Sequence, residues 1–293
     1  MKKGLTITMV FEAESGNYGE STGNITTLKK MSRSDGNMYT YISRQAMRYN
    51  IVQQMGADNT PVSGEKGTVQ FMPTANIDKY PEIDLFGYMK TKGKSDDDAG
   101  GADTRSATVR LSNAISVEPY NSDLDFLTNM GLAKRGNEKG KPIANNIAQS
   151  EVHHALYSYT VAIDLDRIGE DGSISIPAEE KAKRVCDLLE TLQFLYRDIK
   201  GRRENLAPIF VIGGVYERKS PYFEGRCKLN KGVLDVKLLA EVIASCKDTK
   251  ENTLVGMLDG CFTNTSEIRD ALHTETIDDV FSKLKAEVRA YYV

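Results

Sequence analysis

The order of strand and helix patterns is the feature that most restricts the fold of this chain. Apolar residues alternate with Thr and Val over residues 5–11, as in a strand with one core-facing side. Between Ser43, a favourable helix N-cap, and Gly56, a helix stop, apolar residues recur at helical spacing. Later patterns predict strands at 106–117, 153–165, 207–217 and 253–258, and helices at 178–200, 234–246 and 277–292. This β–α–β–β–α–β order with added segments predicts an α+β fold with an RRM-like (ferredoxin-like) core rather than a doubly wound sheet.

Three segments lie outside this order. Residues 12–24 contain three glycines and small polar residues, which predict a loop. Residues 56–105 predict an insertion, with a short helix or turn at 80–89 and a mobile, charged, glycine-containing surface loop at 90–103. Residues 120–151 are polar and are flanked by strand patterns, so they predict a protruding hairpin.

The composition is that of a globular protein without a membrane-spanning helix. The 293 residues are 40% hydrophobic and 27% charged. No apolar run reaches the roughly 18 residues of a transmembrane helix, and the start MKKGLTITMVF reads as a first strand rather than a signal peptide. No C-x-x-C pair and only three histidines are present, so no zinc pattern can be assembled from them and Cys186, Cys227, Cys246 and Cys261. We therefore expect free thiols in the cytoplasm, with no membrane partner, no metal and no cofactor.

A basic island occupies residues 29–48 of a chain whose net charge is −3. It combines one acid, Asp35, with five basic residues: Lys29, Lys30, Arg33, Arg44 and Arg48. Such local positive charge predicts a polyanionic ligand. Bases also stack on tyrosine rings; Tyr39 and Tyr41 lie in the island, and Tyr49 follows it directly. For Tyr39 and Tyr41, on one strand face, core packing and base stacking are equally compatible with the pattern. We expect sequence-tolerant RNA binding.

Arg44 and Arg48 lie four residues apart at the start of the predicted helix, so they stack on one helix face. Taken alone, such a pair is most simply a solvated helix face; the basic loop before it favours RNA contact. The first turns of a helix also expose backbone N–H groups that attract phosphate. A second basic run, at residues 130–141, lies at the tip of the predicted hairpin.

Six motifs occur in a characteristic order: NYGE (17–20), LKKMSR (28–33), YISRQAMRYNI (41–51), IDLFGYM (83–89), SVEPYNSDLDF (116–126) and HHALYSYTVAIDLDRIG (153–169). Together they resemble the DevR-type backbone subunit of the type I-B CRISPR effector Cascade, a member of the RAMP superfamily. The resemblance covers nearly the whole chain and is densest at 9–51 and 116–169. The pattern I-S-x-Q-[SA], here Ile42 to Ala46, also occurs in more distant Cascade backbone subunits.

The resemblance implies a non-enzymatic protein shaped like a right hand. The RRM-like palm is then formed by residues 1–55, 106–119 and 153–293, the finger or web insertion by 56–105, and the β-hairpin thumb by 120–152. Copies of the chain stack along CRISPR RNA together with other Cascade subunits. Each thumb flips one base of its neighbour's RNA, and the remaining bases pair with target DNA, so that base pairing reads the sequence while protein holds the backbone.

The resemblance and the basic island together give a set of expected RNA-binding residues. Ser43 and Gln45 fall at the family's backbone-contacting helix start, and Arg48 falls where related subunits are basic. Arg218 and Lys219 are included because they follow a central strand on the expected RNA face. The full set is Asn17, Lys29, Lys30, Arg33, Ser43, Arg44, Gln45, Arg48, Lys134, Arg135, Arg218 and Lys219.

Asp35 supports an alternative function. Related backbone subunits of type III effectors cleave target RNA with an aspartate in the loop between the first strand and the first helix, where Asp35 also lies. However, SRSDGN is an ordinary turn sequence, and the match is to type I, whose backbone subunits do not cut. A small-molecule enzyme is a third hypothesis, and no nucleophile–base pair or cofactor fingerprint supports it. We expect no enzymatic activity, with a metal-dependent endoribonuclease at Asp35 as the alternative.

Overall fold

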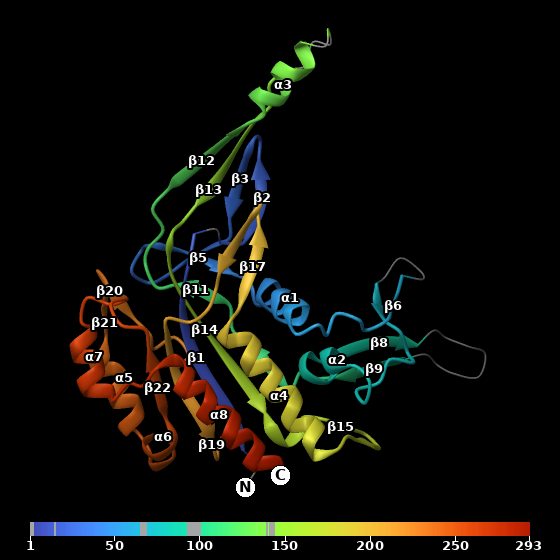
Figure 1. The fold of residues 1–293 in the computed structure, drawn as a ribbon, viewed down its shortest axis with the longest axis vertical. Coiled ribbons are helices and arrows are strands. Elements are labelled where there is room, and N and C mark those ends of the chain that lie inside the picture. The colour runs from blue at the N-terminus through green and yellow to red at the C-terminus, as the bar shows by residue number, and fades with distance from the viewer. Residues whose placement is uncertain (1–2, 15, 65–68, 93–100, 139, 141–143) are drawn as a thin grey trace.

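The computed structural model describes residues 3–14, 16–64, 69–92, 101–138, 140 and 144–293. It has a mixed α+β architecture built around one large antiparallel sheet (Figure 1). The strands of this sheet lie in the order β22-β19-β1-β14-β11-β5-β4, and β10 also pairs with β14. Their bounds are β1 Gly4–Ala13, β4 Lys30–Ser32, β5 Met38–Ile42, β10 Val109–Leu111, β11 Ala114–Ser116, β14 Ala155–Asp164, β19 Phe210–Tyr216 and β22 Leu254–Met257.

The centre of the sheet follows the order that the sequence predicts. The first strand is β1, the second is split into β10 and β11, the third is β14 and the fourth is β19. They lie side by side as fourth, first, third and second. Helix α1 (Arg44–Gln54) comes before the second strand, and helix α4 (Ala178–Gln193) joins the third to the fourth. This arrangement is a β–α–β–β–α–β unit with additions.

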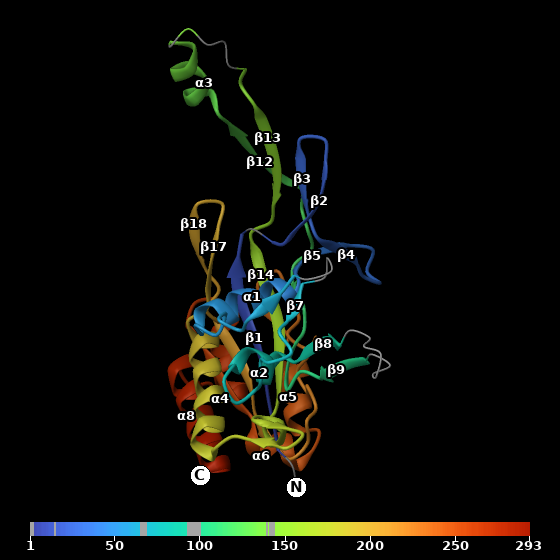
Figure 2. The same cartoon turned by 90° about the vertical axis from the view of Figure 1, so that its right-hand side faces the viewer.

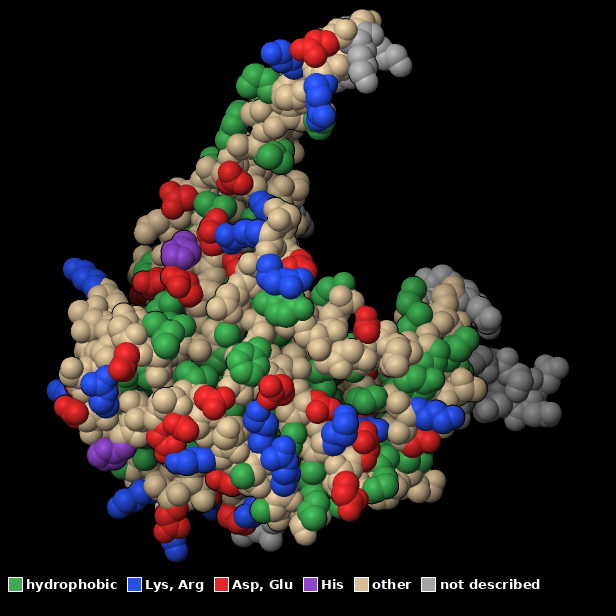
Figure 3. All heavy atoms as spheres, viewed as in Figure 1, with side chains coloured by type: hydrophobic (Ala, Val, Ile, Leu, Met, Phe, Trp, Pro, Cys, Tyr) green, Lys and Arg blue, Asp and Glu red, His purple; other side chains and the backbone are tan. Residues whose placement is uncertain are grey.

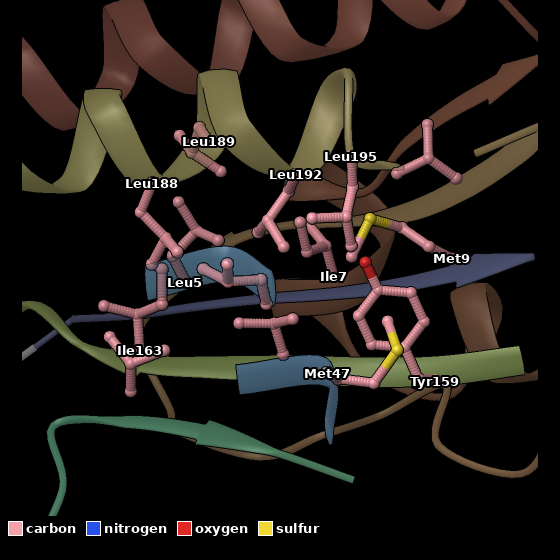
Figure 4. Close-up of a cluster of buried hydrophobic side chains, with 14 of the residues drawn as sticks. Leu5, Ile7, Met9, Met47, Tyr159, Ile163, Leu188, Leu189, Leu192 and Leu195 are labelled. Atoms are coloured by element: carbon pink, nitrogen blue, oxygen red, sulfur yellow. The ribbon is translucent and has the colours of Figure 1, made fainter. Parts of the chain in front are cut away.

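One face of the sheet packs against α1, α4 and α8 (Ile277–Tyr292). Leu5, Ile7 and Met9 of β1 lie on the α4 side of the strand, among apolar side chains of that helix (Figure 4). Burying one leucine contributes roughly 1.5–3 kcal/mol, so these contacts are a main source of stability. The leucines that α4 and the residues after it contribute are Leu188, Leu189, Leu192 and Leu195.

The other face of the sheet is also covered. Helices α5 (Val236–Ala244), α6 (Lys247–Asn252) and α7 (Thr265–Leu272) lie over it, and the second core includes Phe210 and Leu239. The polar side chains of β1 on this face are therefore buried and need partners. The Oγ1 atoms of Thr8 and Thr160 meet at 2.7 Å. Strand β1 is thus buried on both faces, not on one.

Two glycines in β19 allow neighbouring backbone to approach closely. A Cβ atom at Gly213 would lie 2.2 Å from the carbonyl oxygen of Thr6 on β1. A Cβ atom at Gly214 would lie 2.0 Å from the carbonyl oxygen of Asn252 at the end of α6. The glycine pair therefore has a packing role in the centre of the sheet.

Residues 56–105 contain β6 (Val62–Ser63), β7 (Gln70–Phe71), α2 (Pro81–Phe86), β8 (Tyr88–Lys92) and β9 (Gly101–Arg105). These elements extend to one side of α1 and α4 (Figure 1). The short helix predicted at 80–89 is confirmed as α2. The predicted mobile loop falls largely on residues 93–100, which lie outside the described residues.

Residues 120–152 project away from the main sheet (Figures 1 and 2). Strands β12 (Asp123–Thr128) and β13 (Ile147–Val152) form an antiparallel ribbon, and helix α3 (Met130–Asn137) lies at its tip. We call residues 120–152 the projecting ribbon. At its base β13 pairs in parallel with β3 (Ile25–Leu28), which forms a hairpin with β2 (Tyr18–Thr22).

Two expectations from the sequence are wrong in detail near the N-terminus and the second strand. Residues 12–24 are not all loop, because β2 occupies 18–22 and Gly23, at φ 62°, turns the chain into β3. The strand predicted at 106–117 is two short strands. It is interrupted at Ser112, whose Oγ accepts a hydrogen bond from the Thr160 N–H at 2.9 Å.

The helix predicted at 178–200 is too long. Helix α4 ends at Gln193, and β17 (Tyr196–Ile199) and β18 (Arg202–Asn205) follow as a hairpin. Lys200 and Gly201 turn this hairpin at positive φ. The sequence pattern misses this boundary because apolar residues continue past it at helical spacing.

The remaining predicted strands and helices are confirmed to within a few residues, and all four cysteines are free. Among the described residues, no helix combines the length and apolar composition that crossing a membrane requires. The smaller elements are η2 Leu165–Arg167, β15 Glu170–Asp171, β16 Ile174–Ser175, β20 Leu229–Asn230 and β21 Val233–Leu234.

Candidate nucleic-acid interface

Three segments that are distant in sequence meet at the start of α1. Ser43 caps the helix, because its Oγ accepts from the Ala46 N–H at 3.3 Å. The Oδ1 atom of Asn17 accepts from the Ser43 N–H at 3.3 Å, and the Oδ1 atom of Asn113 accepts from the Arg44 N–H at 2.9 Å. The structure therefore brings together the predicted residues Asn17, Ser43 and Arg44.

These hydrogen bonds correct one expectation about phosphate binding. The first helical N–H groups of α1 belong to Arg44, Gln45 and Ala46, and those of Arg44 and Ala46 already have side-chain acceptors within the chain. The expectation that these two groups are exposed to phosphate is wrong. Attraction for an anion at this helix start comes mainly from charged side chains.

The lysines before α1 differ in their partners. The Nζ atom of Lys30 lies 2.7 Å from both carboxylate oxygens of Glu151 and 4.6 Å from the ring centroid of Tyr120. Much of its charge is thereby satisfied within the chain, although the sequence predicts it as an RNA contact. The backbone N–H of Lys29 donates to the Asn17 carbonyl at 2.7 Å, and its half-exposed ammonium has no such carboxylate partner among the described residues.

The turn between β4 and β5 is built around Asp35. Its Oδ2 accepts from the Tyr39 hydroxyl at 2.6 Å and its Oδ1 from the Asn37 N–H at 3.0 Å. The Tyr39 hydrogen bond is the main cause that lowers the pKa of Asp35, with the Asn37 N–H next. Because the chain's own donors occupy both oxygens, the geometry favours the turn interpretation of Asp35 over that of a metal ligand. No group of three or more His, Cys, Asp or Glu side chains suited to a metal occurs within the described residues.

The two tyrosines of the basic island and Tyr49 next to it are not equivalent. Tyr39 is 6% exposed, and the Arg33 guanidinium lies 4.1 Å from its ring centroid. Tyr41 is half-buried in β5. Tyr49, on α1, is 63% exposed. Packing therefore accounts for Tyr39, and Tyr49 offers the most open ring for stacking a base.

The remaining cations of the basic island differ from Lys30 because they have no carboxylate partner. Within the part of the chain that the structure describes, no carboxylate lies within 4 Å of the charged groups of Lys29, Arg33, Arg44 or Arg48. Acidic and basic side chains are otherwise interspersed over the visible face of the molecule (Figure 3). These four cations therefore form the part of the basic island that is free to meet a polyanion.

Arg44 and Arg48 line two different hollows. Arg33, Arg44 and Asn113 line a hollow of about 790 Å³ beside the β4–β5 turn. Arg48 lines a second hollow of about 530 Å³, whose other walls include Phe71 and Tyr88 from residues 56–105. The Arg48 guanidinium lies 5.8 Å from the ring centroid of Phe86. Gln45 is exposed between them in sequence.

The other predicted contacts lie elsewhere. Lys134 and Arg135 are in the last turn of α3, at the tip of the projecting ribbon. Arg218 and Lys219 follow β19 at the edge where Tyr216 pairs with Gly4, whereas α1 begins beside β11, which pairs with β14 at Ser158. Lys219 also contacts Asp166. The structure therefore does not place these four residues beside the start of α1, and their contact with RNA stays a prediction.

The amino-acid sequence matches a family model, described as "CRISPR-associated negative auto-regulator DevR/Csa2", over residues 5–236. This chain belongs to the DevR/Csa2 family. A curated relative, the "CRISPR-associated protein Cas7/Cst2/DevR" of Myxococcus xanthus (strain DK1622), is 26% identical over 161 residues, which are 50% of this chain and 52% of the relative. The match thus spans about half the length of that relative.

Two solved structures share the fold of this DevR/Csa2 protein. A chain of a "CRISPR RNA-guided surveillance complex, pre-nicking" is 11% identical with a TM-score of 0.60, over 96% of this chain and 100% of that one. A chain of another "CRISPR RNA-guided surveillance complex" is 15% identical with a TM-score of 0.57, over 96% and 99% of the two chains. At these identities the likeness is one of fold.

The candidate interface of this DevR/Csa2 protein includes two residues that were not expected from the sequence. Asn113 orients the first turn of α1, and Glu151 neutralises Lys30. Asn113 could have been noticed in the sequence, because asparagine is disfavoured inside a strand pattern. The pairing of Glu151 with Lys30 could not have been predicted, since 121 positions separate the two residues in the sequence.

Proposed function

We propose that this protein is a non-enzymatic subunit that binds CRISPR RNA and forms part of the backbone of an RNA-guided surveillance complex. The observation that carries the proposal is the group of free cations around the start of α1: Lys29, Arg33, Arg44 and Arg48. Membership of the DevR/Csa2 family and the fold shared with chains of CRISPR RNA-guided complexes support it.

The proposed chemistry is contact between cations and RNA phosphates. Lysine and arginine side chains that meet phosphates release counterions, so affinity falls steeply with salt and depends little on base sequence. Ser43, Asn17 and Gln45 would add polar contacts to the sugar–phosphate backbone. Tyr49, being exposed, is available to stack on a base. RNA held by its backbone keeps its bases free to pair with target DNA.

A finer assignment follows from the same proposal. The protein would belong to a type I-B Cascade complex in the cytoplasm, where copies of the chain stack along the guide beside other subunits. The strand order of the central sheet supports an RRM-like palm. Residues 56–105 would be the finger or web, and the projecting ribbon would be the thumb. Lys134 and Arg135 would then contact RNA held mainly by the next copy. Arg218 and Lys219 stay predicted contacts without support from the α1 cluster.

The test compares free cations with a paired one. We expect Arg44→Ala and Arg48→Ala to weaken binding of single-stranded RNA and each to reduce the slope of log affinity against log salt by about 0.7, the value for one phosphate contact. Lys29→Ala should behave similarly, whereas Lys30→Ala should have a smaller effect, because Glu151 holds its charge. The measurement is fluorescence anisotropy with a labelled RNA over a series of salt concentrations.

The matched control is Lys247→Ala, an exposed lysine of α6 that lies far from α1 in the fold. Co-expression with a CRISPR array, followed by extraction and sequencing of bound RNA, identifies the natural ligand. Co-purified repeat–spacer RNA would support the proposal. Wild-type protein that carries no RNA and shows no salt-dependent binding would contradict it.

A further inference from the structure

The 790 Å³ hollow beside α1 has a wall that comes from the C-terminal part of the chain. It is lined by residues of the β4–β5 turn and the start of α1 and also by the loop residues Glu224, Gly225, Cys227, Lys228 and Leu229. This loop leads into β20 and belongs to the segment that covers the second face of the sheet. Phe223 and Cys227 are buried in the second core on either side of the loop's start. The loop is therefore fixed by packing.

Lys228 is the basic residue that this wall presents to the hollow. Its backbone N–H donates to the Arg226 carbonyl at 2.9 Å, and its carbonyl accepts from the Asp235 N–H at 3.0 Å. Its side chain is exposed, next to the buried Cys227. Among the described residues, no carboxylate lies within 4 Å of its ammonium group. The loop thus holds a free positive charge at a fixed place.

The lining of the hollow favours an anion. It contains three cations, Arg33, Arg44 and Lys228, and two acids, Asp35 and Glu224. Asp35 is already occupied by Tyr39 and Asn37. The Asn113 side chain uses its oxygen to accept from the Arg44 N–H, so its amide NH₂ group is left to donate. Hydrogen-bond donors therefore outnumber available acceptors, which suits phosphodiester oxygens.

The size of the hollow fits a segment of RNA backbone. Its volume of about 790 Å³ lies within the range of roughly 300–1,000 Å³ seen for ligand-binding pockets. Arg44 and Lys228 both line it, one at the start of α1 and the other in the loop before β20. A strand that passes through it would therefore meet positive charge from two separate parts of the chain. No residue of the C-terminal wall was expected from the sequence, because Lys228 lies well outside the basic island.

We propose that the RNA backbone passes through this hollow and that Lys228, together with Arg44, binds its phosphodiester groups there. The proposal rests on the proposed RNA-binding function and extends it to the C-terminal segment. It adds Lys228 to the predicted RNA contacts, beside Arg218 and Lys219. The RNA is then bound by the start of α1 and by the loop before β20, which belong to segments that cover opposite faces of the sheet.

The test uses the full chain and a labelled single-stranded RNA. We expect Lys228→Ala to weaken binding several-fold at low salt and to reduce the salt slope by about 0.7, as loss of one phosphate contact does. Lys228→Arg should restore both quantities. Lys237→Ala, an exposed lysine on α5 outside the hollow, is the matched control and should bind as wild type does.

A second measurement avoids substitution. Amine acetylation of the wild-type protein, read by mass spectrometry, should show Lys228 protected when RNA is bound and Lys237 unprotected. If wild type binds RNA and Arg44→Ala weakens it, but Lys228→Ala changes neither affinity nor slope and Lys228 is unprotected, the assignment of Lys228 is wrong and the proposed function stands. If wild type binds no RNA at low salt, both proposals fail.

Discussion

At the scale of residues, burial favours the neutral form of the His153 side chain. It lies where the projecting ribbon joins β14, and its Nδ1 is 2.7 Å from the Thr40 Oγ1. Thr40 also meets the Tyr157 hydroxyl at 2.7 Å, and the Tyr120 ring packs edge-on against the imidazole. Burial lowers the pKa of His153, because the charged ring would lose its hydration. The carbonyl of Pro119 and the carboxylates of Glu118 and Asp123 oppose this shift, which leaves the neutral ring favoured.

This environment predicts a loss of stability in mild acid. The unfolded chain takes up a proton on His153 near pH 6.5, whereas the folded chain does so only at lower pH. The free energy of unfolding should therefore fall as pH drops below about 6.5, by up to about 1.4 kcal/mol per pH unit, until the folded pKa is reached. Urea unfolding at a series of pH values measures this.

Two variants isolate the contribution of His153. His153→Gln should remove this part of the pH dependence, whatever its effect on stability at neutral pH. His154→Gln, at the adjacent exposed position, should keep most of it, because repulsion from His154 makes only the smallest contribution to the lowered pKa of His153. Equal pH dependence in the wild type and His153→Gln would assign the loss to other groups.

The site was only partly predictable at this scale. Charge and spacing in residues 29–48 locate the candidate interface, because neighbouring residues in a helix or hairpin stay neighbours in space. Which cation is free depends on distant carboxylates: Lys29 and Lys30 look alike in sequence, yet only Lys30 meets Glu151. Lys228 could not be found from sequence, since its place in the hollow depends on how a later segment packs on the sheet.

At the scale of elements, Asp84 fastens the insertion to the rest of the molecule. Its carboxylate accepts from Arg105 of β9 at 2.7 Å and from Arg184 of α4 at 2.9 Å. It also accepts from the Gly169 N–H at 2.9 Å. The side chains of Asp84, Arg105 and Arg184 are all buried. A buried ion pair that loses one partner leaves an uncompensated charge. This carboxylate is therefore one main contact that holds residues 56–105 against α4 and the Gly169 loop, beside the hydrogen bonds of Arg184 to the carbonyls of Ile77 and Asp78.

Loss of the Asp84 carboxylate should destabilise the protein strongly. Asp84→Ala leaves Arg105 and Arg184 without their shared acid, at a cost of about 3–5 kcal/mol. Denaturant unfolding, with limited proteolysis of residues 56–105, measures the effect. The control is Asp78→Ala, because only the backbone carbonyl of Asp78 meets Arg184. A loss below about 1 kcal/mol for Asp84→Ala would show that the insertion is held by other contacts.

Elements were predictable where local signals agreed. Ser43, apolar residues at helical spacing and Gly56 define α1 almost to the residue. Strand β2 was missed because it lies in a polar segment with three glycines, residues 12–24. Its partner β3 also pairs with β13, which is distant in sequence. Residues 194–200 were assigned to α4 because the apolar pattern does not register a hairpin turn at Lys200 and Gly201.

At the scale of the whole molecule, apolar surface is concentrated on the projecting ribbon. Leu124, Phe126, Leu127 and Leu132 are each more than half exposed, Leu127 at 66%. In α3 the buried residue is Ala133 alone, so the ribbon tip has almost no core of its own. Contiguous exposed apolar residues mark an interaction surface more often than a free one. Together with the proposed function, this favours contact between the tip and a neighbouring copy on RNA.

Replacing apolar residues at the tip should separate folding from assembly. Leu127→Ser combined with Leu132→Ser should leave the unfolding free energy of the monomer within about 0.5 kcal/mol, because both side chains are exposed. The same variant should no longer form high-mass assemblies on long RNA. Analytical ultracentrifugation with and without RNA gives the readout. Wild-type-sized assemblies from the double variant would exclude the tip as an assembly contact.

The pairing of β13 with both β12 and β3 has a consequence for spacing along a guide. Because the base of the ribbon is hydrogen-bonded on two sides, its direction is set by the sheet, and its reach is set by strand length at about 3.4 Å per residue. In an assembly of identical copies, a ribbon of fixed direction and length would set the distance between each copy and the tip of its neighbour's ribbon. The nucleotide interval between successive tips would then be a property of protein geometry, the same for every guide. Adding two residues to each strand, which lengthens the arm by about 7 Å, would reset that interval.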